Sequence, residues 1–413
     1  MAENIIALVD CDSFFVSCEQ ALDATLLGKA VCVLSNNDGC IVARSREAKE
    51  LGIAMGMPYF MAKKQFPDAI YVSGDLHKYK DFSRKVMAIL RDFSPTVEVY
   101  SIDEAFVELS GLKKMYKMNY FEIAKAIKEK IKEEVGINVS IGVSRSKVLA
   151  KLACENAKPN KKFSHCSLPP RGARAGVGGS PLVKGNGIYL IGKGKIPKLL
   201  KTTKVQEIWG IGKNTTALFN RWGVLYCSEL VKKSDEWLKE RVGKRGVELR
   251  HELLGEAIDK VKMSRKLPKS IQNTRSFPKS TSDINYIKNA LNIHIHTSCS
   301  KLRYLKGKCK AVSVMLKTKD FVVYWEKKVL EDSTNFELDI SRAIFKLLEK
   351  IYDPALIYRS CGVTLENIDY SEESQLSLFA SCKGKNYEKL ASAIDKLEKK
   401  FGKNTIRTGF FEE

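Results

Sequence analysis

A short apolar segment near the start of the chain, Ile5 to Val9, constrains the fold most strongly. It contains β-branched residues and stops abruptly at Asp10, which predicts a buried strand that carries a carboxylate at its end. A second apolar segment, Ala30 to Leu34, is followed by the turn-rich residues 35–39. The sequence therefore predicts two strands near the start of the chain.

The pattern continues as an alternation of strands and helices up to about residue 144. Residues 97–110 are typical of a strand, a short turn and a strand, with Asp103 and Glu104 at the turn. Isoleucines recur every fourth residue within 121–135, as on an amphipathic helix, and apolar residues alternate over 139–143. This order predicts an α+β sheet layered with helices.

The remaining chain divides by composition. Residues 161–186 carry five lysines or arginines, no acid and many glycines and prolines, which predicts a flexible loop. Helical patterns follow to about residue 258, and the polar, basic segment 264–279 contains two prolines and is expected to be a linker. Helices and strands alternate again over 280–367, which indicates a separate α+β domain, before a polar tail that starts at residue 368.

Charge points to a polyanionic partner. The 413 residues include 70 lysines and arginines against 48 acids, a net charge of +22, and a length that suggests several modules of about 100 residues. Nucleic acid fits best, because no apolar or amphipathic basic segment is present to dock the chain on a membrane. The N-terminus has neither the pattern of a signal peptide nor that of a membrane span, so a cytoplasmic location is expected.

Two residue types bear on metal chemistry. The eleven cysteines contain no C-x-x-C pair, which favours reduced, buried thiols over disulfides or zinc. Three carboxylates, Asp10, Asp103 and Glu104, stand at strand ends, where they could hold two magnesium ions if the chain bends to bring them together. Acids at strand ends are more often solvated turn residues, so the pattern alone leaves both readings open.

A resemblance of several sequence motifs to a known family favours the metal-binding interpretation of these carboxylates. The motifs stand in order as Asp10-Cys11-Asp12-Ser13-Phe14-Phe15, then Asn36 to Arg44, Glu47-Ala48-Lys49, Gly52 and Gly56, then Tyr100 to Phe106, and later Ser144 to Ala153. Together they resemble the signature blocks of Y-family DNA polymerases, and the Asn36 to Cys40 stretch resembles the UmuC-type branch. The resemblance covers nearly the whole chain.

This resemblance implies roles for individual residues. Asp10, Asp103 and Glu104 would bind two Mg²⁺ ions, with the carbonyl of Cys11 as a backbone ligand. Phe15 matches the steric gate that packs against the deoxyribose and excludes a 2′-hydroxyl. The basic residues Arg46, Lys49 and Lys158 match positions that contact the triphosphate, where cations offset the charge on the leaving group.

Two further motifs lie in the second half of the chain. The segment that includes Gly210, Gly212 and Lys213 resembles the hairpin of a helix-hairpin-helix, whose amides can bind a DNA phosphate without reading sequence. Gln375-Leu376-Ser377-Leu378-Phe379 resembles the peptide that binds the bacterial sliding clamp, with apolar anchors in a polar tail. Basic residues of the later domain could track DNA phosphates, namely Arg275, Lys279, Lys301, Arg303, Lys306, Lys308 and Lys310.

The resulting prediction is a right-hand polymerase of α+β multidomain class. Its predicted parts are the palm (1–13 and 76–160), the fingers (14–75), a basic insertion (161–186), the end of the palm with the thumb (187–263), a linker (264–279), the little finger (280–367) and a tail (368–413). Such an enzyme would extend a primer on damaged templates without proofreading, supported by the sliding clamp, a processed UmuD-type dimer and a recombinase filament. The alternatives are a catalytically silent DNA-binding scaffold at the clamp and a palm-type nucleotidyl cyclase.

Overall fold

The computed structural model describes residues 4–35, 38–158, 187–263, 267–371 and 384–402. The chain divides into two compact units, Met1–Arg265 and Lys266–Glu413. Each unit has its own hydrophobic core and is described by itself.

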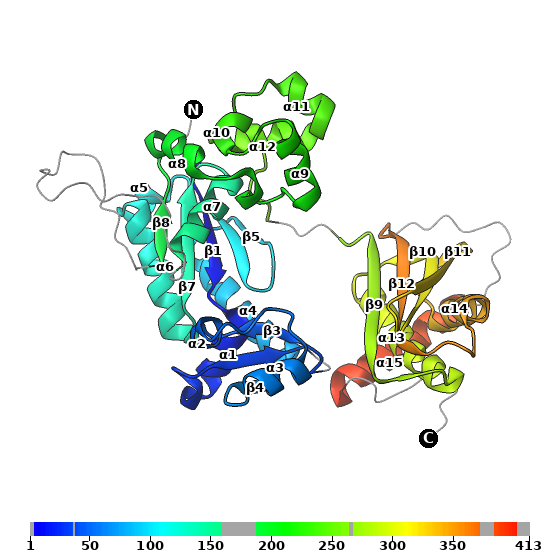
Figure 1. Cartoon of the computed structure of the whole chain (residues 1–413). Coiled ribbons are helices and arrows are strands. Elements are labelled where there is room, and N and C mark those ends of the chain that lie inside the picture. The colour runs from blue at the N-terminus through cyan, green and yellow to red at the C-terminus, as the bar shows by residue number, and fades with distance from the viewer. Residues whose placement is uncertain (1–3, 36–37, 159–186, 264–266, 372–383, 403–413) are drawn as a thin grey trace, which may run out of the picture. The chain divides into compact units, whose positions relative to one another are not determined.

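The first unit is built on a five-stranded sheet in the order β5-β6-β1-β7-β8 (Figure 1). The central strand β1 (Ile6–Cys11) runs antiparallel to both β6 (Glu104–Glu108) and β7 (Val139–Ser144). The edge strands are β5 (Val97–Val99) and β8 (Ile188–Leu190). All six residues of β1 are buried, because the strand has a neighbour on each side and helices on both faces.

Helices cover the two faces of this sheet unequally. On one face, α4 (Leu76–Phe93) and α6 (Tyr120–Val135) pack against Ala7 and Val9 of β1. On the other face lies α7 (Lys147–Ala157), which packs with Ile6, Leu8 and Phe106. Side chains along a strand alternate between faces, so Asp10 shares the face of α7 with Leu8.

One glycine allows α7 to lie very close to the sheet. A Cβ on Gly142 of β7 would stand 2.0 Å from the backbone N of Cys154 and 2.3 Å from the carbonyl O of Ala150. Any larger residue would therefore push the helix away from the strand.

A smaller sheet forms the lower lobe of this unit in Figure 1, with strand order β3-β2-β4. Its core contains Cys32, Ile41 and Ile53. The lobe comprises α1 (Phe14–Leu22), β2 (Val31–Leu34), β3 (Ile41–Arg44), α2 (Arg46–Glu50), α3 (Tyr59–Gln65) and β4 (Ile70–Ser73).

Short helices form a lobe at the opposite end of the sheet (Figure 1). Their shared core includes Phe219, Leu230 and Leu249. The helices are α8 (Ile196–Thr202), α9 (Lys213–Arg221), α10 (Cys227–Leu230), α11 (Asp235–Val242) and α12 (Lys244–Leu254). One remaining helix of the unit, α5 (Leu112–Tyr116), precedes α6.

The second unit is an antiparallel sheet in the order β11-β10-β12-β9, packed against two helices. Apolar residues of α13 and α14 bury one face of the sheet. The elements are β9 (Ser270–Thr281), α13 (Ile284–Tyr304), β10 (Lys308–Thr318), β11 (Val323–Thr334), α14 (Glu337–Ile351) and β12 (Tyr358–Asp369).

The prediction of a linker over 264–279 is wrong for most of that range, because β9 begins at Ser270. Its sequence is polar because β9 is an edge strand that pairs only with β12, so most of its side chains are exposed. Pro278 is compatible with such an edge, where one side of the strand needs no ladder hydrogen bonds.

A C-terminal helix, α15 (Gly384–Phe401), is held to α13 by polar contacts. The guanidinium of Arg303 forms two hydrogen bonds with the carboxylate of Asp395, at 2.8 and 2.7 Å. The imidazole of His296 lies between Glu337 of α14 and Glu398 of α15. In the part of the chain that the structure describes, no helix is long and apolar enough to cross a membrane, and all nine cysteines there are free thiols.

Candidate active site

Asp10 and Glu104 face each other across neighbouring strands. They are directly paired in the β1–β6 register and lie on the face of the sheet that α7 covers. Two lysines of α7 and its C-terminal boundary neutralise them: Lys158 Nζ is 3.0 Å from Asp10 Oδ2, and Lys151 pairs with Glu104. The site is thus a buried corner of two carboxylates and two ammonium groups.

Burial and hydrogen bonding shift the pKa values of this pair in opposite directions. Desolvation and the neighbouring Glu104 raise the pKa of Asp10. Burial also acts on Glu104, but hydrogen bonds with Asp10 and Lys151 outweigh it and hold the pKa of Glu104 below its usual value.

Asp103 occupies the turn between β5 and β6. Its backbone carbonyl accepts a hydrogen bond of 2.9 Å from the amide of Cys11, and its carboxylate accepts one from the hydroxyl of Ser101. Neighbouring residues can share a site only if the chain bends between them, and this turn supplies that bend: Asp103 lies in the turn and Glu104 is the first residue of β6.

These residues line one cavity of about 290 Å³. The cavity brings together seven residues that the sequence predicted for the site: Asp10, Cys11, Phe15, Lys49, Asp103, Glu104 and Lys158. Its remaining lining comes from Ser13, Phe14, Val42, Ala43, Arg44 and Met55. Carboxylates from the large sheet and cations from α2 and α7 thus face a shared space.

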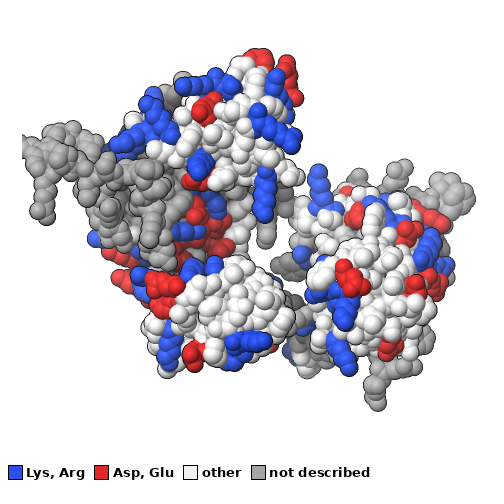
Figure 2. Space-filling model, in the orientation of Figure 1, with Lys and Arg blue, Asp and Glu red and all other residues white. Residues whose placement is uncertain are grey.

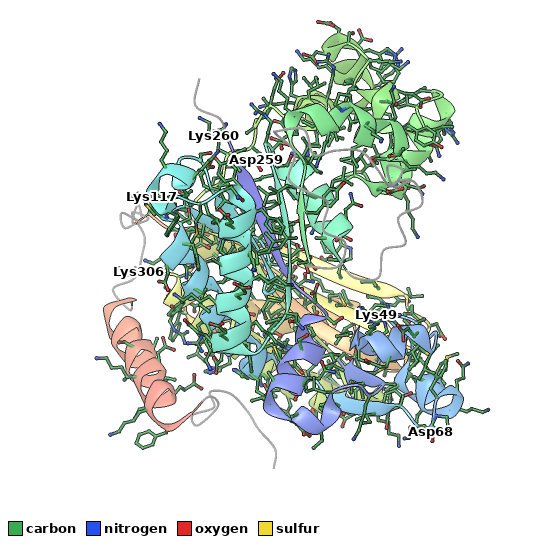
Figure 3. All side chains as sticks on the ribbon, turned by 90° about the vertical axis from the view of Figure 1, so that its left-hand side faces the viewer. Lys49, Asp68, Lys117, Asp259, Lys260 and Lys306 are labelled. Carbon is green, nitrogen blue, oxygen red and sulfur yellow. The ribbon has the colours of Figure 1, made fainter. Side chains whose placement is uncertain are left out.

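The lower lobe supplies the basic wall. Lys49 of α2 donates a 2.7 Å hydrogen bond to the hydroxyl of Ser13, the residue that precedes α1. Burial and the nearby Arg44 guanidinium lower the pKa of Lys49, because a second positive charge disfavours its protonated form. In Figure 3, Lys49 lies on the side of this lobe toward the large sheet, and Asp68 lies at the lobe's far edge.

Phe15 is held from behind by another aromatic ring. It stacks on Tyr79 of α4 with centroids 4.5 Å apart and an interplanar angle of 21°. Tyr79 is itself buried, and its hydroxyl donates a 2.8 Å hydrogen bond to Glu19. The ring of Phe15 therefore presents a fixed wall to the cavity.

Arg46 lies apart from this group. Its side chain is exposed and forms an ion pair with Glu50 one turn along α2, at 2.9 Å, and it does not line the cavity. The predicted triphosphate contact of Arg46 stays a prediction.

Sequence reasoning missed two cations of the site. Arg44 is on β3 two residues after Val42, so strand alternation places both side chains toward the cavity. Lys151 lies on α7 seven residues, about two helical turns, before Lys158, which directly follows the last residue of the helix, and this spacing predicts that both side chains lie on the same side. Both signals are present in the sequence.

The glycine hairpin lies in the helical lobe, outside the cavity. Gly210 has a φ of +95°, and Gly212 is the N-cap of α9, which begins at Lys213. In the part of the chain that the structure describes, no side-chain hydrogen bond caps this helix, so its first amide groups have no side-chain partner there. A 3₁₀ turn, Val205–Glu207, precedes the hairpin instead of the α-helix that the sequence predicts there.

Other predicted contacts have mixed outcomes. Arg303 pairs with Asp395 in two hydrogen bonds, so its guanidinium is engaged within the protein rather than open to DNA. The insertion 161–186 and the pentapeptide Gln375 to Phe379 lie outside the described residues.

The donor chemistry of the site fits a hard divalent cation. Carboxylate oxygens are the ligands that Mg²⁺ prefers, and Asp10 places one in a corner where its charge is poorly solvated. Within the described ranges, no three His, Cys, Asp or Glu side chains gather closely enough to hold an ion. In this arrangement Lys151, Lys158 and Ser101 engage the three carboxylates instead.

Comparison with known proteins decides the family. Models of the impB/mucB/samB family and of its C-terminal domain match residues 9–155 and 268–378. The chain is 30% identical to the protein UmuC of Salmonella typhimurium, over 97% of this chain and 92% of UmuC. The chain belongs to the UmuC-type Y-family DNA polymerases.

Other Y-family members agree with this assignment. A DNA polymerase IV of Dehalococcoides mccartyi is 30% identical and spans 97% of this UmuC-type chain and 96% of its own length. A Y-family polymerase chimera of Dbh and Dpo4 has a TM-score of 0.69 at 25% identity, covering 89% of this chain and all of the chimera. An insertion ternary complex of the Dbh DNA polymerase has a TM-score of 0.57. The predicted polymerase fold is confirmed.

Proposed function

We propose that this chain performs error-prone translesion synthesis, adding deoxynucleotides to a primer end on damaged DNA templates by two-metal phosphoryl transfer. One observation carries the proposal: Asp10 and Glu104 face each other at a cavity that Lys49, Lys158 and Phe15 also line. Acids and cations around one space suit a reaction in which a hydroxyl attacks a triphosphate.

The parts of the polymerase would map onto the lobes as follows. The five-stranded sheet is the palm, the lobe around β2–β4 is the fingers, helices α8–α12 form the thumb, and the second unit, whose sheet begins with β9 at Ser270, is the little finger. Basic side chains are spread over the thumb, and acids gather in the hollow between thumb and fingers (Figure 2). This distribution suits DNA phosphates held by the thumb and cations held at the palm.

Each residue of the site has a proposed task. Asp10, Glu104 and Asp103, with the Cys11 carbonyl, would hold two Mg²⁺ ions, which when bound activate the primer hydroxyl and offset charge on the pyrophosphate. Lys49 and Lys158 bind the triphosphate, for which Lys158 must exchange its carboxylate partner Asp10 for phosphate oxygens. Phe15, backed by Tyr79, excludes a ribose 2′-hydroxyl by contact with the sugar.

Partners enter the proposal through the family resemblance. The pentapeptide Gln375 to Phe379 would bind the sliding clamp and keep the enzyme at the primer end, which raises its local concentration there. A processed UmuD-type dimer and a recombinase filament are the proposed activators in the response to DNA damage. No proofreading activity is proposed for the chain.

Primer extension tests the proposal. Undamaged and abasic templates are supplied with Mg²⁺, deoxynucleotides, clamp and the UmuD-type partner, and wild type is compared with Asp103→Asn and Asp68→Asn. Asp68 is an exposed acid at the far edge of the fingers, so Asp68→Asn controls for the loss of one negative charge. We expect extension on both templates by wild type and Asp68→Asn, and a loss of at least 100-fold in Asp103→Asn.

Three results would contradict the proposal in different ways. DNA binding without extension by any variant would favour a silent scaffold at the clamp. A cyclic nucleotide formed without DNA would favour a cyclase. Extension that Asp103→Asn leaves unchanged would refute the assignment of the metal ligands.

A further inference from the structure

Trp209 belongs to two hydrophobic clusters at once. It packs against the thumb core, which includes Phe219 and Leu249, and against a second cluster that contains Leu8 and Phe106 of the palm strands. Trp209 is only partly buried, but it is a direct physical contact between the two groups, and a chain of side-chain contacts is the route by which a displacement of one group reaches another.

A polar contact accompanies this packing. The indole Nε1 of Trp209 donates a 3.1 Å hydrogen bond to the hydroxyl of Tyr100, and the two rings meet at 90° with centroids 5.3 Å apart. Phe106 completes the cluster, with centroids 5.8 Å from Trp209 and 5.9 Å from Tyr100. Edge-to-face contacts of this kind stabilise one relative orientation of the rings.

Tyr100 begins the turn that carries the predicted metal ligands. The amides of Tyr100 and Ser101 both donate 3.0 Å hydrogen bonds to the carbonyl of Glu104, closing the turn around Asp103. Lys151, which pairs with the Glu104 carboxylate, has its Nζ 5.8 Å from the centroid of the Tyr100 ring. The aromatic cluster therefore contacts the turn at its start and, through Phe106, just beyond its end.

On the thumb side, Trp209 directly precedes the glycine hairpin. Gly210 adopts the left-handed conformation, and the first amides of α9 follow Gly212. The guanidinium of Arg245 lies 5.9 Å from the Trp209 ring centroid and borders Gly210. The residues placed to meet a DNA phosphate are thus continuous with the ring cluster.

We propose that Trp209 and Tyr100 are positioning residues that couple binding of DNA at the thumb hairpin to the placement of the Asp103–Glu104 turn. This inference rests on the proposed function for the identity of the ligand. A phosphate at the hairpin fixes Trp209, Trp209 fixes the Tyr100 hydroxyl, and Tyr100 holds the turn at the geometry that the reaction needs. DNA thereby sets the carboxylates at the end of the primer that they are to extend.

The test separates binding from rate. Trp209→Phe keeps a ring but removes the indole donor, Tyr100→Phe removes the acceptor, and the double variant removes both. DNA affinity is measured by fluorescence anisotropy, and the maximal single-turnover incorporation rate is measured at saturating primed DNA and nucleotide. We expect each single variant to lower the maximal rate by roughly 5- to 10-fold, the effect of one hydrogen bond. The DNA dissociation constant should stay within about twofold, and the double variant should be no slower than either single one.

Trp237→Phe is the matched control. This tryptophan lies in the same thumb core and contacts Trp222, with centroids 5.3 Å apart, but it is not part of the cluster at the turn. Its maximal rate should equal that of wild type. Variants at Trp209 and Tyr100 with wild-type rates, or a rate loss explained by weaker DNA binding, would overturn the coupling.

Hydrogen exchange gives a readout that does not depend on turnover. The amides of Tyr100 and Ser101 should exchange more slowly when duplex DNA binds to wild type, and this protection should be at least threefold smaller in Trp209→Phe. Equal protection in both proteins contradicts the inference. If wild type neither binds nor extends primed DNA, the proposed function itself fails, and the DNA end of the coupling fails with it. Wild-type extension with unaltered variants would refute the coupling alone.

Discussion

Replacement of Gly142 by alanine should destabilise the palm and slow the reaction together. The added Cβ would lie 2.0 Å from the backbone N of Cys154 and 2.3 Å from the carbonyl O of Ala150. Both are backbone atoms of α7, so no rotamer change can relieve the contact. The helix has to move away from β7 by roughly 1 Å, and such overpacking costs about 3 kcal/mol of unfolding free energy.

The same displacement reaches the site, because α7 and its C-terminal boundary carry Lys151 and Lys158. A shift of about 1 Å in positioning groups can lower a rate by about 100-fold. Urea denaturation followed by tryptophan fluorescence measures the stability, since three of the four tryptophans, Trp209, Trp222 and Trp237, lie in the first unit and only Trp325 lies in the second. Primer extension without urea, at a temperature well below the unfolding transition, measures kcat/KM.

Gly192→Ala is the control for this experiment. Nothing lies within 4 Å of a Cβ on Gly192, and its φ of −76° suits any residue. We expect a change within about 0.5 kcal/mol for the control. The reasoning is refuted if Gly142→Ala also stays within that range and extends primers within twofold of wild type.

Three other predictions concern charged groups. Burial, with a smaller effect of Arg275, lowers the pKa of His294 to about 4. The imidazole therefore binds a proton more tightly in the unfolded chain than in the folded one, and the free energy of unfolding falls as the pH drops from 6.5 toward 4. His294→Gln should remove up to about 3 kcal/mol of that loss, measured by urea denaturation across the range; an unchanged pH profile contradicts it. The side chain of Lys147 is 1% exposed and forms ion pairs with Glu98 and Asp259. Lys147→Met should lower the free energy of unfolding by roughly 2–3 kcal/mol, less than if its two partners were fully buried. A loss below about 0.5 kcal/mol, the size expected for a surface substitution, would count against this prediction. Arg303→Met removes two hydrogen bonds to α15 and should speed limited proteolysis of that helix by about 10-fold; equal cleavage rates would disprove this.

Periodicity in the sequence was sufficient to predict most regular elements of the chain. The strand at Ile5 to Val9 and the helix over 121–135 are found as β1 and α6, because burial on both faces and burial of one stripe leave distinct patterns. The strand at 270–281 was missed, since an edge strand with exposed side chains has the composition of a linker. Its pairing with β12 is a long-range contact, and local composition does not record it.

The sequence predicted residues that belong to the site, but not which of them pair with one another. Motif resemblance named seven residues that one cavity does bring together. It did not reveal that Lys151 and Lys158 pair with the two facing carboxylates, which depends on how closely α7 approaches β7. The contact between Trp209 and Tyr100 joins residues more than a hundred positions apart, and neither residue type suggests the other.

The central place of β1 in its sheet has a consequence for biosynthesis. This strand is synthesised before the other strands of its sheet, yet both of its partners are distant in sequence: Ile6 pairs with Glu108 on one side and with Ser144 on the other. At about 5–20 residues per second, roughly 5–20 s pass before the first partner strand is made. During that time a strand that is apolar apart from Asp10 has no sheet to join, and its unpaired backbone groups can bind a chaperone or another nascent chain. The pace of translation between β1 and β6 therefore sets how long this strand remains without its first partner.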